Sequence, residues 1–255
     1  MNPFFAIALN GFREARRNRV SVIVVLFALG LLACSSLVTN VTVYSFERVL
    51  TDVGIGTMSM ALVLLAIFLS SGLMAREVER RTIFLMVTKP ISRSTFLLAR
   101  FVGNMLTLGA ILLAMGGLFA IEVWISGFSI HASQLTALAM LWFEVLVVSS
   151  VGFAMSSNSS QMVSALVTTG VYFAGHLAPD LYHLSSRSEH LAVRWVGKVA
   201  YYLLPNLDRL NFRPYAAYNQ TVSVSHFLSA AGYGLAYAAV MLGIASLVFS
   251  RRDFR

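Results

Sequence analysis

Three histidines at a regular spacing are the first residues in this sequence that could bind a metal ion. His176, His183 and His190 are separated by seven residues, so a helix would place them on one face. Imidazole is a common ligand of zinc and of other transition metals. However, Pro179 interrupts the helical register, and no carboxylate or cysteine stands at a recognisable ligand spacing. Interfacial hydrogen bonding is therefore the favoured role of these histidines, with a metal site as the alternative.

Two glutamates lie in apolar stretches, where a charge is costly. Glu144 falls near the middle of the apolar run 135–155, and Glu122 lies toward the end of the run 96–126. A charged side chain at the centre of a bilayer costs about 2.5–3.5 kcal/mol on the insertion scale. Glu144 is therefore expected to be protonated, to be paired, or to face the interior of a helix bundle. It either serves a substrate or proton path or makes a structural hydrogen bond between helices, whereas Glu122 is nearer to water.

Motifs for catalysis and for nucleotide binding are absent from the sequence. It contains no H-E-x-x-H, no G-x-S-x-G and no G-x-x-x-x-G-K-[ST]. The chain is therefore predicted not to bind ATP through a P-loop of its own. No enzymatic activity and no cofactor bound by this chain are expected, although absent motifs leave an intramembrane hydrolase open.

The composition predicts an integral membrane protein. Hydrophobic residues make up 58% of the 255 residues and charged residues 12%, about half of the usual quarter. Runs of about 20 apolar residues recur, as a hydrocarbon core about 30 Å thick requires. The predicted fold class is an all-α polytopic membrane protein with a single transmembrane domain over residues 1–255. Six transmembrane helices are predicted, at 20–38, 53–75, 96–126, 135–155, 162–178 and 224–250.

The distribution of Lys and Arg predicts the orientation of the chain. Thirteen of these residues fall in the N-terminal segment, in the segment around 76–100 and in the C-terminal tail, and six fall on the opposite side. Because cytoplasmic segments are enriched in Lys and Arg, both termini are predicted to be cytoplasmic. The net charge of +8 is explained by these flanks, and we expect no nucleic-acid partner.

The single cysteine, Cys34, excludes an intrachain disulfide bond. The stretch LLAC at 31–34 resembles a bacterial lipobox after a basic region. The leader would then be about 33 residues, which is long for a signal peptide, and further apolar runs follow. An inert cysteine within the first span is the favoured interpretation.

Three segments outside the predicted spans carry their own patterns. Residues 1–19 are predicted to form a helix that lies flat in the membrane interface, with a simple basic flank as the alternative. Residues 76–95 are predicted to form a short cytoplasmic helix that ends near Pro90, either as a docking surface for a soluble partner or as a basic flank on lipid headgroups. Residues 179–223 are predicted to form a small extracytoplasmic cap of one or two amphipathic helices, against the outer leaflet or partly re-entrant.

Four stretches together resemble the ABC-2 type permeases, the membrane subunits of ATP-binding-cassette transporters. They are similar in particular to the branch for multicopper-enzyme maturation, which includes the permease serving nitrous-oxide reductase assembly. The stretches are MNPFFAIALNGFREARRNRV at the start, EVERRTIFLMVTKPISRSTFLLARFVG at 77–103, YYLLPNLDRLNFR at 201–213 and VFSRRDF at 248–254.

The resemblance implies a coupling helix in the segment after the second span. This helix would seat in a groove of a separate ATPase subunit, and Arg81 stands where many relatives have Gly. Residues 1–19 would be the connecting helix along the inner leaflet of a bacterial cytoplasmic membrane. Two ATPase copies, which carry ATP and Mg, and a second permease chain, identical or different, would complete the transporter. The docking residues would be Glu77, Glu79, Arg80, Arg81, Thr82, Lys89, Pro90 and Arg93.

Two other functions stay open on the sequence. The chain could be a membrane anchor that transmits force to an extracytoplasmic assembly, with the loop 179–223 as the partner surface. It could also be a motor-free secondary transporter, although such proteins show internal symmetry and paired broken spans that are not found in this sequence. The nature of any transported substrate and the direction of transport are not encoded in a recognisable motif.

Overall fold

The computed structural model describes residues 46–79 and 92–251, together with scattered positions between 4 and 33. For 73–79, 93 and 251 the description covers the backbone alone. This part of the chain is helical throughout and holds no β-strand, in agreement with the predicted all-α class. Its elements are α3 (Phe46–Glu79), α4 (Arg93–Ile125), α5 (Ala132–Ser156), α6 (Gln161–Ser186), α7 (Leu191–Leu203), η2 (Asp208–Leu210), α8 (Arg213–Ala217) and α9 (Val224–Arg251).

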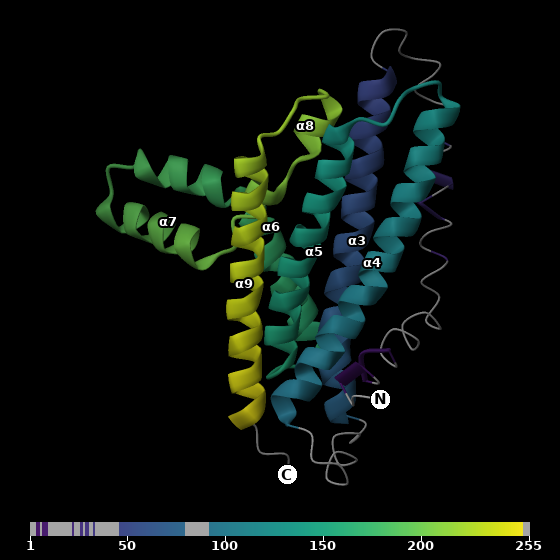
Figure 1. The fold of residues 1–255 in the computed structure, drawn as a ribbon. Coiled ribbons are helices and arrows are strands. Elements are labelled where there is room, and N and C mark those ends of the chain that lie inside the picture. Colours follow the sequence, from purple (N-terminus) through teal and green to yellow (C-terminus); the bar gives the residue numbers. More distant parts are fainter. Residues whose placement is uncertain are drawn as a thin grey trace.

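Helix α5 is the central element of the bundle. It packs most extensively against α3 and α9 and also contacts α4 and α6 (Figure 1). Its buried face runs along most of its length and includes Met140, Val147 and Phe153. The Phe153 ring meets the edge of the Phe101 ring of α4 at 5.2 Å. A helix that is apolar on nearly every side is typical of the middle of a membrane bundle.

Short polar segments set the ends of the helices. Ser92 begins α4 as its N-cap, since its side-chain oxygen accepts a hydrogen bond from the Thr95 amide at 3.2 Å. Gly127 follows the end of α4 with a φ of +82°, a conformation that favours glycine. The polar stretch 156–161 turns the chain between α5 and α6. The predicted turns at 127–134 and 156–161 are thus confirmed within a few residues.

Four of the described helices are long and apolar enough to cross a membrane. They correspond to the predicted spans at 53–75, 96–126, 135–155 and 224–250. Helix α6 covers the predicted span 162–178 and is 26 residues long, but its most apolar stretch is less apolar than those of these four helices. The predicted first span, 20–38, lies almost entirely outside the described residues. The number of six spans therefore stays a prediction.

The boundaries of α3 differ from the prediction at both ends. The predicted outer loop 39–52 is already helical from Phe46, and the helix continues past residue 75 to Glu79. The first four residues of the predicted coupling segment therefore belong to α3. Of its other residues, 92–95 cap and begin α4, and 80–91 lie outside the described residues.

The N-terminal residues that the structure describes are helical and lie against α4. Ala8 is buried, whereas Phe5 is 66% exposed. The Ala8 carbonyl oxygen lies so close to Gly103 of α4 that a side chain at position 103 would collide with it. This contact fits a helix at the N-terminus, but the rest of the predicted interfacial helix 1–19 falls on positions that are not described.

Pro179 does not end α6, contrary to the prediction. The helix continues through Pro179 to Ser186. Proline has no amide hydrogen, so it cannot donate to the carbonyl group four residues earlier, which is that of Gly175. In this fold the Leu207 amide donates to the Gly175 oxygen instead, at 3.2 Å. The lost helical hydrogen bond is thus replaced from outside the helix, and the predicted loop 179–223 begins with helical residues.

The predicted cap before the last span is confirmed in its helical content. After α6 come α7, the single turn η2 and the short helix α8, all within 179–223. Figure 1 shows α7 and the end of α6 projecting to one side of the bundle, and the Tyr237 hydroxyl of α9 donates to the Leu203 carbonyl oxygen at the end of α7, at 3.2 Å. Helix α8 lies instead at the end of the bundle where α9 begins.

Glycine at position 175 should be required for this arrangement. A Cβ atom there would lie 2.6 Å from the Pro205 carbonyl oxygen, so Gly175→Ala must displace the 205–207 segment. We expect a loss of about 1–3 kcal/mol of stability, measured as a lower unfolding temperature in detergent. Gly170→Ala is the matched control on the same helix, because no atom lies within 4 Å of its Cβ position. An equal fall in unfolding temperature for Gly175→Ala and Gly170→Ala would show that the close contact at Gly175 is not required.

Candidate functional site

A polar cavity lies between three of the long helices. It has a volume of about 300 Å³ and is walled by α3, α5, α6 and the segment 210–213. We call it the Glu144 cavity. Its polar lining residues are Ser59, Glu144, Tyr172, His176, Asn211 and Arg213.

Glu144 is the most buried of the charged groups in this cavity. Its side chain is only 5% exposed, and its Oε1 lies 3.1 Å from Nε2 of His176. The His176 ring is more open, at 27%, and is in edge contact with the Tyr172 ring at 4.8 Å. A carboxylate can only accept hydrogen bonds, so Nε2–H is the donor when Glu144 is ionised. Of the three states expected for Glu144, the structure shows the paired one, and the pair joins α5 to α6.

A second charged pair borders the same cavity. Arg213 Nε lies 3.0 Å from Asp52 Oδ1, with both side chains about half exposed. Asp52 is on α3 and Arg213 begins α8. The Arg213 side chain also lies directly over Gly56, where a Cβ atom would be 2.8 Å from its Nη1. The ion pair thus fixes the 210–213 segment against α3 beside the cavity.

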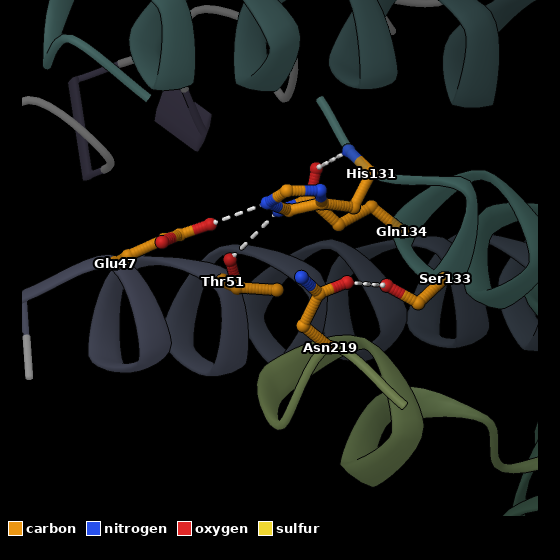
Figure 2. A network of polar contacts seen from close by, with 6 residues as sticks. All are labelled: Glu47, Thr51, His131, Ser133, Gln134 and Asn219. Atoms are coloured by element: carbon orange, nitrogen blue, oxygen red, sulfur yellow. Dashed lines mark hydrogen bonds and ion pairs between the residues drawn. The ribbon is translucent and has the colours of Figure 1, made fainter. Parts of the chain in front are cut away.

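A further polar network links the same helices beyond this ion pair. Figure 2 shows its side chains meeting between α3, the start of α5 and Asn219, two residues after the end of α8. Gln134 is fully buried and donates to Thr51 at 3.1 Å, and its oxygen accepts from the His131 amide. His131 also pairs with Glu47 at 3.1 Å. A last contact joins Ser133 to Asn219 at 3.0 Å.

This arrangement can bind a small polar ligand or exchange a proton. A carboxyl group and an imidazole in contact, at the wall of a cavity of this size, supply both an acceptor and a titratable donor. Buried polar groups of this kind inside a membrane bundle are costly unless they are paired. The cavity therefore brings several polar side chains together inside the described helix bundle.

Glu122 and two of the histidines lie away from this site. Glu122 is buried, at 8% exposure, on α4, which contributes no residue to the cavity lining. His183 and His190 are exposed, and His190 is the N-cap residue of α7. Within the described residues, no three potential metal ligands of the His, Cys, Asp and Glu types gather. The heptad spacing of the three histidines therefore does not bring them to one site.

The predicted ATPase-docking residues lie at the edge of the described chain. Glu77 and Glu79 belong to the end of α3 and Arg93 to the start of α4, by their backbone alone. Their role stays a prediction. The remaining docking residues and the lone cysteine lie outside the described residues: Arg80, Arg81, Thr82, Lys89, Pro90 and Cys34.

The sequence does not indicate which residues surround Glu144. The spacing of the histidines marks out its partner His176 for another reason, and no pattern marks out Tyr172, Asn211 or Arg213 as residues of the same cavity. The available signal was the presence of several polar side chains in or next to an apolar run. Their convergence depends on which helices are neighbours, and no local pattern encodes that.

The comparison with known protein families decides the class of this protein. Residues 5–254 match the family described as ABC-2 family transporter protein. The chain belongs to the ABC-2 transporter family. No curated protein matches it. The family match covers nearly the whole chain, so this ABC-2 chain is a multi-pass membrane component, and its apolar helices agree with that assignment. The branch suggested by the sequence stays an expectation.

In this ABC-2 chain the Glu144–His176 contact should stabilise the packing of α5 against α6. His176→Phe leaves a buried carboxyl group without a partner, so we expect a loss of about 1–3 kcal/mol. The same substitution in a Glu144→Leu background should cost less than half of that. Thermal unfolding of the four proteins in detergent gives the coupling energy. Additive effects of the two substitutions would show that the pair contributes nothing.

Proposed function

We propose that this chain is the membrane-spanning permease subunit of an ATP-driven transporter. A separate ATPase subunit hydrolyses ATP, and the chain converts that work into export or other movement across the membrane. The observation that carries the proposal is the family match over residues 5–254. The absence of a P-loop from the sequence agrees with a division of labour between two kinds of subunit.

The positions of the helix ends that flank the coupling segment support this function. Helix α3 ends at Glu79 and α4 begins at Arg93, and both of these helix ends lie at the end of the bundle where α9 finishes (Figure 1). The sequence concentrates Lys and Arg in 76–100 and in the C-terminal tail, so we assign this end of the described bundle to the cytoplasm. A charged segment that joins α3 to α4 on this side would be available to a soluble ATPase.

Helix α3 offers a route from the ATPase to the Glu144 cavity. It is a continuous helix of 34 residues, about 50 Å long at 1.5 Å per residue. One end carries Glu77 and Glu79, and the other carries Asp52 and the cavity residue Ser59. A displacement of the coupling segment would thus reach the wall of the cavity through one rigid element. ATP can drive this change only if it binds one arrangement of the complex more tightly than the other.

The working complex would contain two ATPases and two permease chains. ATP and Mg would be held by the ATPases alone. The complex would reside in a bacterial cytoplasmic membrane, and the segment 179–223 would be available to an extracytoplasmic partner.

Docking to the ATPase should depend on the charged residues of the coupling segment. We expect Glu79→Ala with Arg81→Ala to reduce co-purification of the partner ATPase subunit about tenfold, which corresponds to a loss of about 1.4 kcal/mol of binding free energy. ATP hydrolysis by the reconstituted complex should fall with it. The control is Glu189→Ala with Arg187→Ala, which removes the same two residue types from the exposed connection between α6 and α7. Undiminished co-purification of the first variant would count against the docking role.

A further inference from the structure

The end of α6 and helix α7 form a helical hairpin that leaves the bundle. We call residues 179–203 the α6–α7 hairpin. The two helices pack closely, because a Cβ atom at Gly197 of α7 would collide with the Ser185 side chain of α6. The Tyr182 and Tyr201 rings lie 4.8 Å apart across the same contact. The hairpin lies next to the first half of α9 and is only partly covered by the rest of the protein (Figure 1).

Large apolar side chains cover much of the outer surface of this hairpin. Leu184, Val196 and Leu203 are each about 70% exposed, and Leu181 and Val199 are also open. Next to a bundle of membrane-crossing helices, such a surface is suited to lipid acyl chains. The hairpin is thus expected to lie within one leaflet, the leaflet that surrounds the first half of α9.

A basic pocket opens between the two helices of the hairpin. Its volume is about 330 Å³. Arg194 and Lys198 stand one helical turn apart on α7, and the Lys198 ammonium lies 5.9 Å from the centre of the Trp195 ring. The polar and aromatic residues that line the pocket are Tyr182, Ser185, Ser186, Arg194, Trp195 and Lys198.

Three of the donor groups in this pocket make no hydrogen bond or ion pair within the described part of the chain. No carboxylate there lies within 4 Å of Arg194 or Lys198, and the Tyr182 hydroxyl makes no hydrogen bond. The two serine hydroxyls donate to carbonyl oxygens of their own helix, Ser185 to Tyr182 at 3.0 Å and Ser186 to His183 at 2.8 Å. The Arg194 guanidinium and the Lys198 ammonium therefore face the pocket without an anionic partner in the described chain, and the Tyr182 hydroxyl faces it without a hydrogen-bond acceptor.

We propose that this pocket binds the phosphate group of an anionic phospholipid. The guanidinium and ammonium groups supply charge-assisted hydrogen bonds to phosphate oxygens, and the Tyr182 hydroxyl adds a third donor. The surrounding apolar side chains contact the acyl chains. A free anion would pair with the two cations but would leave the surrounding apolar side chains exposed. A phospholipid has both an anionic headgroup for the cations and acyl chains for the apolar side chains. Basic pockets between membrane helices bind anionic headgroups by the same chemistry.

The experiment measures lipid retention by the full-length protein. The purified chain is reconstituted with phosphatidylglycerol or phosphatidylcholine, and bound lipid is counted by native mass spectrometry. We expect Arg194→Gln with Lys198→Gln to lower phosphatidylglycerol retention about tenfold and to leave phosphatidylcholine retention unchanged. The control is Arg187→Gln with Arg209→Gln, which removes the same charge from exposed positions outside the pocket and should change retention less than about twofold.

A gentler variant keeps the proposal testable if the double variant does not fold. Tyr182→Phe removes only the hydroxyl group and should lower phosphatidylglycerol retention several-fold. Three results would overturn the proposal: equal losses in the pocket and control variants, unchanged retention in Tyr182→Phe and the pocket variant, or displacement of the lipid by inorganic phosphate at equal concentration. Binding of the ATPase should be unchanged in all of these variants, because none of the substituted residues belongs to the predicted docking segment.

Discussion

The hydrocarbon core offers no water to hydrogen-bond with, and this constraint explains how most polar groups of the bundle are placed. Backbone groups are satisfied within helices. Hydroxyl groups donate to carbonyl oxygens of their own helix, as Ser71 does to Ile67 and Thr107 to Gly103. The buried carboxyl group of Glu144 has no such local acceptor or donor, so it is paired across the helix contact with His176.

Helix α3 is unbroken, so it connects the wall of the Glu144 cavity with the proposed docking segment. It runs from the ion pair of Asp52 with Arg213 to the predicted docking residue Glu79. The polar network of Figure 2 fixes its first turns to α5 through Gln134. Movement at the cytoplasmic end would therefore be transmitted to the cavity wall, or would have to break these contacts. The same geometry would serve a transporter and a subunit that transmits force to an external assembly.

The sequence predicts the elements of this fold better than their contacts. Hydropathy alone locates four long apolar helices that could cross a membrane, since an apolar run of this length has no other stable state in a bilayer, although α3 begins well before its predicted span. The rule that proline ends a helix was wrong at Pro179, because the tertiary hydrogen bond from Leu207 to Gly175 replaces the one that proline removes. Glu144 was found from its cost in an apolar run. Its partner His176 was not, since pairing depends on helix neighbours that lie far apart in the sequence.

The central claim is that the segment after α3 enters the cytoplasm and binds an ATPase. A single cysteine introduced by Lys89→Cys, in a Cys34→Ser background that removes the one native cysteine, tests it directly with a membrane-impermeant maleimide. The account predicts labelling in inside-out vesicles, no labelling in sealed right-side-out vesicles, and protection when the ATPase is added. Labelling from the outer side, or the absence of labelling from either side because the residue is immersed in lipid, would contradict it.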